Sequence, residues 1–248
     1  MTLEQFFAEN REVAVAFSGG VDSAYLLYAA TRYAARVKAY YVNTAFQPEF
    51  ELADARRLAD ELGADMLVLH VDVLSNSAVT ANPSDRCYHC KNTLFRQILR
   101  AAENDGFPVL LDGTNASDDA GDRPGMRALR ELSVRSPLRE CGLTKAEIRR
   151  LSREAGLFTW DKPAYACLAT RIRTGEEITL QKLKQTEKAE GFLFGLGFRD
   201  FRVRMVGNTA KLELQEADLP LLLENREKIV TELRKDYDSV LLNLEVRK

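Results

Sequence analysis

The segment from Ser18 to Ser23, Ser-Gly-Gly-Val-Asp-Ser, has the composition of an anion-binding loop. A short apolar run, 13–17, precedes it, and residues of helical composition, 24–30, follow it. Paired glycines let backbone N–H groups approach an anion closely, and the amino end of a helix adds partial positive charge. The Asp22 carboxylate would repel a bare phosphate, so its place in a phosphate loop makes sense only if Mg²⁺ lies between the two groups. We therefore expect an ATP site with Mg²⁺. The expected ATP-binding residues of the loop are Ser18, Gly19, Gly20, Asp22 and Ser23.

Three of the four cysteines are candidates for a second reactive centre. Cys87 and Cys90 form a C-x-x-C pair, which we place on a loop before a helix that begins near Lys91, and Cys167 lies far downstream. Such a pair can be a redox couple or half of a zinc site. The other His and Cys candidates for a fourth zinc ligand are His70, His89 and Cys141. Purely structural cysteines are the alternative, because a thiol also packs as a small hydrophobe.

Two arginines and a glutamate in the last third of the chain could also take part in the chemistry. Arg202 and Arg204 alternate along an expected strand, so both side chains face one side and could clamp a phosphate. An ordinary solvent-facing strand surface is the alternative. Glu190 lies on an expected helix, where it could act as an acid or base or be a solvated charge.

Asp118, Asp122 and Arg123 lie close together in the sequence. The two acids could bind Mg²⁺ or cap helices, which is the commoner use of Asp near a helix start. Arg123 could reach a phosphate or pair with these acids. The sequence leaves these alternatives open.

The order of the expected elements is that of an α/β protein with a doubly wound parallel sheet. We expect strands at 13–17, 37–42, 66–69 and 109–111, and helices after the loop, at 48–62 and at 91–102. Ligands of such sheets gather at the carboxyl ends of the strands. Thr44 and Gly113 follow two of these strands, and we add both to the expected ATP-binding residues.

The order of the expected helices and strands changes from about Gly175 onward. We expect a helix at 179–196, strands at 201–206 and 210–214, a helix at 217–234 and a strand at 239–246, with a hairpin turn at Gly207-Asn208. This pattern predicts a small C-terminal α+β domain. The expected domains are 1–170 and 171–248.

Composition narrows the class of protein. The 248 residues, 46% of them hydrophobic, can bury a substantial core. Net charge is −2 and neither half of the chain is basic, which weighs against a large nucleic-acid substrate. We find neither a signal-like start nor an apolar run of membrane-spanning length, so we expect a cytoplasmic protein without a membrane partner.

The phosphate loop has the pattern of neither a Walker loop nor a dinucleotide fold. It resembles the SGGxDS loop of the ATP-pyrophosphatase, or PP-loop, superfamily. That resemblance implies cleavage of ATP to AMP and pyrophosphate while a substrate is adenylated. Amide synthetases, tRNA thiolases and cofactor thiolases would share the loop, and a non-catalytic ATP-binding protein is a further alternative.

Other segments, in order along nearly the whole chain, resemble the LarE family, the ATP-dependent sulfur transferases of nickel-pincer cofactor synthesis. These segments are 86–91, 112–118, 122–125, 136–138, 160–163, 166–172, 189–190 and 202–204. The resemblance implies adenylation of the carboxylates of pyridinium-3,5-biscarboxylic acid mononucleotide and their conversion to thiocarboxylates. It also implies that Arg202 and Arg204 bind the mononucleotide phosphate, and that the assembly is a homohexamer.

The cysteines bear on the source of sulfur. In the best-known version of the family, one cysteine at the position of Cys167 gives up its own sulfur. The set Cys87, Cys90 and Cys167 resembles instead the branch that holds a [4Fe-4S] cluster, whose fourth iron carries a sulfide from an external source. We expect the cluster, with sacrificial sulfur donation by Cys167 or a tRNA thiolase as alternatives. The expected catalytic residues are Cys167, Cys87, Cys90 and Glu190.

Overall fold

The computed structural model of the chain describes residues 1–118 and 124–246. The chain divides into two compact units, one made of Met1–Val73 and Asp85–Lys162, the other of Leu74–Ser84 and Pro163–Lys248. Compared with the expected domains, the second unit also takes in residues 163–170 and an early segment, 74–84. None of the described helices combines the length and apolar character needed to cross a membrane.

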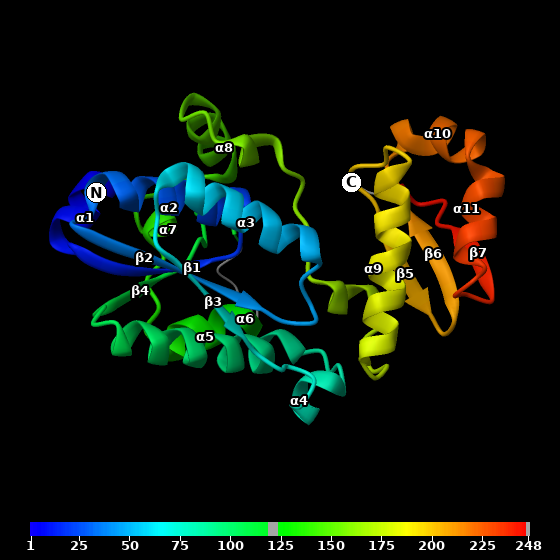
Figure 1. Ribbon diagram of the computed structural model, residues 1–248, viewed down its shortest axis with the longest axis horizontal. Coiled ribbons are helices and arrows are strands. Elements are labelled where there is room, and N and C mark those ends of the chain that lie inside the picture. The colour runs from blue at the N-terminus through cyan, green and yellow to red at the C-terminus, as the bar shows by residue number, and fades with distance from the viewer. Residues whose placement is uncertain (119–123, 247–248) are drawn as a thin grey trace. The chain divides into compact units, whose positions relative to one another are not determined.

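The first unit is built on a parallel sheet of four strands in the order β3-β2-β1-β4. The strands are β1 Glu12–Phe17, β2 Arg36–Asn43, β3 Met66–His70 and β4 Val109–Leu111. Val13, Val15 and Phe17 of β1 enter one core cluster, whereas Ala14 enters another. Burial on both faces is typical of parallel sheets, and Figure 1 shows helices on both sides. The expected doubly wound α/β fold is therefore confirmed.

The helices of the first unit cover these two faces. They are α1 Leu3–Glu9, α2 Val21–Tyr33, α3 Glu49–Leu62, α5 Arg86–Asn104, α6 Pro124–Glu131, α7 Pro137–Glu140 and α8 Lys145–Glu154. Helices α1, α2 and α3 contribute to the larger cluster, and α5 to the other. As predicted, α3 stops at Gly63, which adopts a left-handed φ of 61° that glycine reaches without strain.

The start of α5 differs from the sequence prediction. The helix begins at Arg86 and not near Lys91, so Cys87 and Cys90 lie in its first turns and not on a preceding loop. The first turn of the helix closes at Asp85, whose carbonyl accepts a hydrogen bond from Tyr88 N–H at 2.8 Å. Its carboxylate also lies 3.4 Å from His89 Nε2, one turn along the helix.

The second unit contains a three-stranded sheet in the order β5-β6-β7. Its elements are α4 Ser77–Thr80, α9 Leu180–Gly195, β5 Arg202–Val206, β6 Thr209–Glu213, α10 Leu219–Glu224, α11 Arg226–Leu233 and β7 Ser239–Leu242. Strands β5 and β6 form the expected hairpin, with φ of 58° at Gly207. Strand β7 pairs with β6 in parallel, the last pair being Leu212 with Leu242, and ends at Leu242 and not at 246 as predicted.

The prediction of a single helix at 217–234 is wrong. The structure has a 3₁₀-helix, Glu216–Asp218, followed by α10 and α11, which are separated at Asn225. The Asn225 side chain donates a hydrogen bond to Leu221 O at 3.0 Å, and its ψ of 10° departs from helical geometry. Asparagine side chains compete with the backbone in this way, and here the competition breaks the helix.

The segment 74–84 is joined to the second unit by backbone and side-chain hydrogen bonds. Gly175 N–H donates to Asn82 O and Ile178 N–H donates to Thr80 O, both at 2.8 Å. The buried Asn82 side chain donates to Arg173 O at 2.8 Å. The second unit is therefore discontinuous in sequence.

Candidate functional site

The phosphate loop of the first unit is shaped by glycine geometry and by its own serines. Gly19 has a φ of 74°, and Gly20 is the N-cap of α2. Ser23 Oγ accepts from Ser18 N–H at 3.2 Å, lies 3.0 Å from Ser18 Oγ and donates to Gly20 O at 3.1 Å. These hydrogen bonds hold the turn at the amino end of α2, where the helix favours an anion.

Gly113 lies where β4 ends and packs directly against the first turn of α2. A Cβ atom at this position would lie 2.9 Å from Ser23 N and 3.1 Å from Ser23 Cα, both backbone atoms that cannot swing aside. Thr44 follows β2, where its hydroxyl donates to Gln47 Oε1 at 2.6 Å and accepts from Phe46 N–H at 3.0 Å. Both predicted ATP-binding residues therefore lie at the carboxyl edge of the sheet beside the loop, and both have structural contacts there.

Asp22 lies in the first turn of α2 and has two partners. Lys145 Nζ lies 2.5 Å from its Oδ2, and Asn115 Nδ2 donates to its Oδ1 at 3.3 Å. A partly exposed carboxylate at the phosphate loop has the chemistry of a Mg²⁺ ligand, so the residues fit the expected metal. Asp118 accepts from Asn115 N–H at 2.9 Å and so caps a turn, whereas the candidates Asp122 and Arg123 lie outside the described residues.

Lys162, the last residue of the first unit, also reaches the loop. Its Nζ donates to Asp54 Oδ2 at 2.7 Å and lies 3.5 Å from Gly19 O. Arg149 of α8 fixes this region by donating to Lys162 O at 2.9 Å and to Trp160 O at 2.7 Å. Two lysines, Lys145 and Lys162, thus lie at the loop, and neither was predicted from the sequence to have a role there.

Cys87 and Cys90 are three residues apart in α5, a spacing that places both thiols on one helix face. Cys87 is exposed and lines a hollow of about 340 Å³ with Lys91, Thr114 and Asp118. All four cysteines are described, and none is in a disulfide. Two thiols on one face fit two ligands of an iron-sulfur cluster. As far as their residues are described, neither unit gathers three His, Cys, Asp or Glu side chains into a metal site.

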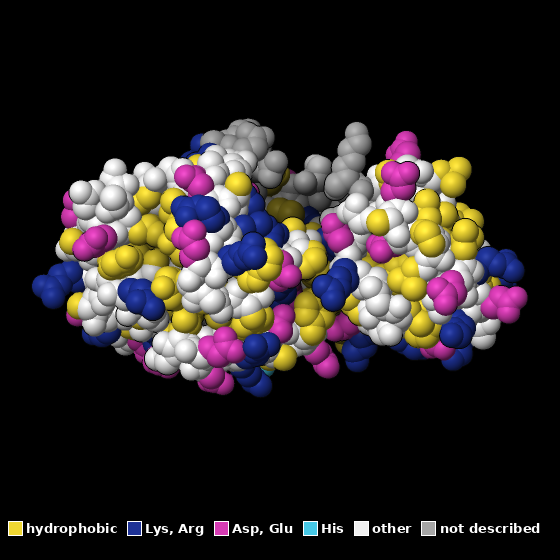
Figure 2. All heavy atoms as spheres, turned by 90° about the horizontal axis from the view of Figure 1, so that it is seen from above, with side chains coloured by type: hydrophobic (Ala, Val, Ile, Leu, Met, Phe, Trp, Pro, Cys, Tyr) yellow, Lys and Arg dark blue, Asp and Glu magenta, His cyan; other side chains and the backbone are white. Residues whose placement is uncertain are grey.

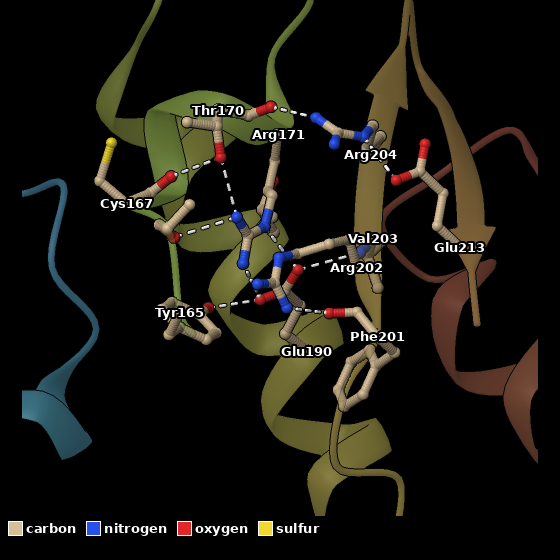
Figure 3. Close-up of polar contacts among 12 residues, drawn as sticks. Tyr165, Cys167, Thr170, Arg171, Glu190, Phe201, Arg202, Val203, Arg204 and Glu213 are labelled. Atoms are coloured by element: carbon tan, nitrogen blue, oxygen red, sulfur yellow. Dashed lines mark hydrogen bonds and ion pairs between the residues drawn. The ribbon is translucent and has the colours of Figure 1, made fainter. Parts of the chain in front are cut away.

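A buried ion pair organises the second unit. Glu190 of α9 accepts from Arg171 Nε at 2.7 Å and Nη2 at 3.0 Å, and both side chains are at most 1% exposed. The same carboxylate accepts from Val203 N–H at 2.9 Å and from the Tyr165 hydroxyl. Figure 3 shows these groups converging on Glu190. Both oxygens of the carboxylate that was predicted to act as an acid or base therefore accept hydrogen bonds from these groups.

The pKa values of the partners of Glu190 follow from this arrangement. Burial works to lower the pKa of Arg171, but the hydrogen bonds with Glu190 and the charge of that carboxylate, with smaller contributions from Tyr165 and Cys167, together raise that pKa above its usual value. Burial raises the pKa of Tyr165, and the neighbouring Glu190 charge raises it further. Arg171 therefore stays charged, and Tyr165 stays protonated and donates its hydrogen.

Three arginines hold the backbone of the segment that carries Cys167. Arg171 Nη1 donates to Ala166 O at 3.0 Å and Arg204 Nη1 donates to Thr170 O at 2.6 Å, while Arg202 Nη2 donates to Ala164 O. These carbonyls belong to residues that precede and follow Cys167 in the sequence, and Figure 3 shows the contact between Arg204 and Thr170. The thiol precedes a 3₁₀-helix, Leu168–Arg171, whose first turn closes with Thr170 N–H donating to Cys167 O at 2.9 Å.

Arg202 and Arg204 project toward the same segment, in agreement with their alternation along β5. Arg202 is buried and also donates to Phe201 O at 2.5 Å. The half-exposed Arg204 donates to Glu213 Oε2 at 2.7 Å. Of the two, Arg204 is the better placed to exchange a partner for an arriving phosphate.

Comparison with known proteins decides the family. The sequence model of the asparagine synthase family matches residues 4–118. An uncharacterized protein of Synechocystis is 39% identical over 86% of this chain and 80% of its own length. Pyridinium-3,5-bisthiocarboxylic acid mononucleotide synthase of Lactiplantibacillus plantarum is 34% identical over 87% of this chain and 79% of its own length. The chain belongs to the LarE family. An uncharacterized protein of Methanocaldococcus jannaschii, 30% identical over 96% of this chain and 91% of its own length, extends the likeness to an archaeon.

Membership of the LarE family confirms the predicted family and the predicted class of enzyme, an ATP-dependent sulfur transferase with a PP-loop. Within each unit the structure brings predicted residues together. In the first unit, the loop, Thr44 and Gly113 share the carboxyl edge of the sheet. In the second, Glu190, Arg202 and Arg204 each contact a residue of the segment 164–171 that carries Cys167. The roles of these residues stay predictions.

Several residues at these two sites were not predicted from the sequence, because their partners are distant in sequence. They are Lys145, Lys162, Tyr165 and Arg171. One local signal was available for Lys145: Thr144 and Glu147 form a capping box that marks the start of α8. Nothing local indicates that Arg171 pairs with Glu190.

Proposed function

We propose that this protein adenylates the carboxylates of pyridinium-3,5-biscarboxylic acid mononucleotide and converts them to thiocarboxylates for the nickel-pincer cofactor. The observation that carries the proposal is the similarity to the Lactiplantibacillus plantarum synthase over 87% of the chain. The phosphate loop and the fixed cysteine segment support it, because the reaction needs both an activating nucleotide site and a sulfur site.

The first half of the reaction uses the loop. A carboxylate oxygen of the substrate attacks the α-phosphorus of ATP, the bond to the β-phosphate breaks, and pyrophosphate leaves. A carboxylate is a poor electrophile, and AMP gives it a good leaving group. Ser18, Gly19, Gly20 and Ser23 would hold the phosphates, and Mg²⁺ on Asp22 would neutralise charge on the departing pyrophosphate.

The second half forms the carbon–sulfur bond. Sulfide attacks the acyl carbon, the bond from that carbon to the AMP oxygen breaks, and AMP leaves. We propose that Cys87, Cys90 and Cys167 would hold a [4Fe-4S] cluster, which supplies an iron without a protein ligand for an exogenous sulfide. Arg171, holding Ala166 O, helps to fix the backbone beside the Cys167 thiol. Two rounds give the bisthiocarboxylate.

The substrate phosphate is proposed to bind Arg204, with Arg202 behind it. Arg204 is partly exposed and its carboxylate partner, Glu213, can be replaced by a phosphate that takes a bidentate contact. On the face that Figure 2 draws, basic and acidic side chains are interspersed, so that face lacks the continuous positive surface that a large nucleic acid needs. The same view shows hydrophobic side chains at the surface of the second unit, which supports the expected homo-oligomer.

The test is a turnover assay under anaerobic conditions with iron-loaded protein, MgATP, the biscarboxylic mononucleotide and sulfide. We expect pyrophosphate release that depends on the mononucleotide and a product whose mass shows exchange of oxygen for sulfur. Cys141→Ala is the matched control, because Cys141 packs against the hydrophobic core of the first unit and is not one of the three predicted cluster ligands, so turnover should stay unchanged. AMP release stimulated by bulk tRNA and not by the mononucleotide would refute the substrate and favour a tRNA thiolase.

Iron and protein mass separate the two sulfur sources. The cluster predicts bound iron and sulfide, loss of both in Cys87→Ala, and repeated turnover. Sacrificial donation predicts one turnover, retained in Cys87→Ala, and a protein that has lost H₂S at Cys167.

A further inference from the structure

We propose that Tyr165 is a positioning residue for the Cys167 thiol, because its side chain fixes the stretch 163–166, which leads to that thiol, to α9. The inference deepens the proposed function and rests on it for the use of Cys167. It starts from a tyrosine between two alanines, Ala164 and Ala166, to which the sequence pattern gave no role.

Tyr165 is the residue through which this stretch is attached by a side chain. Residues 163–166 are all described, form neither helix nor strand, and include three exposed residues, whereas Tyr165 is half-buried. Proline and alanine side chains have no group that can donate or accept a hydrogen bond. Irregular backbone at the surface is mobile unless specific contacts fix it. The place of the thiol therefore depends on Tyr165 and on the contacts of the neighbouring carbonyls.

The hydroxyl of Tyr165 binds a carboxylate that is itself fixed. It donates to Glu190 Oε2, which also accepts from Arg171 Nη2 at 3.0 Å. The other oxygen, Oε1, accepts from Val203 N–H at 2.9 Å, and Glu190 is 1% exposed on α9. A hydrogen bond to a charged acceptor is among the strong ones. The hydroxyl thus joins the chain, two residues before Cys167, to a defined point of the helix.

The ring of Tyr165 supports the two arginines that hold its own backbone. The guanidinium carbons of Arg171 and Arg202 lie 4.7 and 5.3 Å from the ring centroid, within the range of a cation–π contact. The same two arginines donate to Ala166 O and Ala164 O, the carbonyls that flank Tyr165. Figure 3 shows the three side chains together. Ring, hydroxyl and carbonyl contacts therefore act on one short stretch of chain.

Two substitutions separate the hydroxyl from the ring. Tyr165→Phe keeps the ring beside both arginines and removes the hydrogen bond to Glu190, whereas Tyr165→Leu removes both. Because Tyr165 is argued to act through the backbone, its loss should displace the thiol and leave the rest of the unit folded. A displacement of about 1 Å can cost a reaction about 100-fold.

The experiment is amide hydrogen exchange, followed by mass spectrometry, on the full-length protein without added iron. The reporter is the segment 164–170, in which Thr170 N–H donates to Cys167 O at 2.9 Å. We expect exchange there to be about 10- to 100-fold faster in Tyr165→Phe, the range of one hydrogen bond to a charged group, and faster still in Tyr165→Leu.

The matched control is Tyr41→Phe. It removes the same atom from a buried tyrosine of the first unit, whose hydroxyl has no hydrogen-bond partner within the described chain. Exchange in 164–170 should stay at the wild-type rate in this variant.

Strand β6 separates positioning from a merely structural role. Its amides, in residues 209–213, belong to the sheet of the same unit and are followed in the same experiment. Positioning predicts faster exchange in 164–170 alone. Equal acceleration in β6, or exchange in 164–170 within about twofold of wild type, overturns the proposal.

Turnover supplies a second measurement. Tyr165→Phe should lower kcat about 10-fold or more at unchanged KM for the mononucleotide, and an unchanged kcat would also overturn the proposal. Thermal unfolding checks that the variants are folded, and Tyr165→Phe carries the test should Tyr165→Leu not fold. The exchange experiment contains neither ATP nor mononucleotide. Failure of the wild type to form a thiocarboxylate would therefore count against the proposed function, while unchanged exchange counts against Tyr165.

Discussion

Replacing Glu190 by alanine is expected to destabilise the second unit by about 3–5 kcal/mol, the usual cost of removing one partner of a buried ion pair. The substitution leaves the Arg171 guanidinium buried without its counter-ion, although both side chains are at most 1% exposed in the wild type. It also removes the acceptor of Val203 N–H and of the Tyr165 hydroxyl. Each lost acceptor alone costs about 1–3 kcal/mol, a cost that overlaps with that of the ion pair.

The assay must report on the second unit. The sole tryptophan, Trp160, lies in the first unit, so its fluorescence follows the wrong part of the chain. Hydrogen exchange at Val203 N–H follows the affected bond directly, and urea unfolding by circular dichroism gives the total loss. Glu190→Gln keeps the oxygen acceptor without the charge and should fall between wild type and alanine.

A further variant tests the cause of the instability. Replacing the pair together, Arg171→Met with Glu190→Leu, removes the stranded charge and should recover much of the stability lost in Glu190→Ala. A loss of unfolding free energy below about 1 kcal/mol in Glu190→Ala would refute the reasoning, since the contacts of Glu190 would then contribute little to stability. Turnover lost in Glu190→Gln at unchanged stability would instead favour the acid–base role expected from sequence.

Two other predictions test the first unit. Gly113→Ala should destabilise the protein by about 1–3 kcal/mol and weaken MgATP binding, because its Cβ would meet backbone atoms of Ser23 at 2.9 and 3.1 Å. Gly191→Ala, where a Cβ meets nothing within 4 Å, should not destabilise, and equal thermal shifts for the two would refute the steric argument. Hydrogen bonding to Arg135 lowers the pKa of Glu140 below its ordinary 4.5, so the pair stabilises the fold above that pH and loses its effect as pH falls through the lower folded value. Urea unfolding should show Glu140→Gln costing at most about 1 kcal/mol at neutral pH and nothing in strong acid, and a cost that grows with acidity would contradict this sign.

Local patterns predicted the sheet well because each strand carries its own signal. The strand 109–111 was expected with the bounds it has, and the end of α3 followed from Gly63 alone. Two helix starts carry capping-box signals that were not used in the prediction, at Thr2 for α1 and at Thr144 for α8. Information of this kind lies within a few residues, where periodicity and capping act.

The polar sites were harder to predict because their partners are far apart in sequence. Glu190 reads as a solvated helix charge, and only its pairing with Arg171 makes burial tolerable. Lys145 and Asp22 meet only because α8, which follows β4 in the chain, returns to the loop. The Cys167 thiol could be predicted from the sequence, but the contacts between arginines and the backbone carbonyls around it could not. Every residue type has a backbone carbonyl, so the sequence does not show which carbonyls accept hydrogen bonds.

The discontinuous second unit has a consequence for the order of events during synthesis. Residues 74–84 leave the ribosome early, yet their hydrogen-bond partners, Ile172 to Ile178, appear only much later. The first unit ends at Lys162, so all of its residues are synthesised before Cys167. The loop from Ser18 to Ser23 therefore leaves the ribosome together with its whole unit before the cysteine segment does, and a fragment beginning at Pro163 would lack residues 74–84 of its own unit.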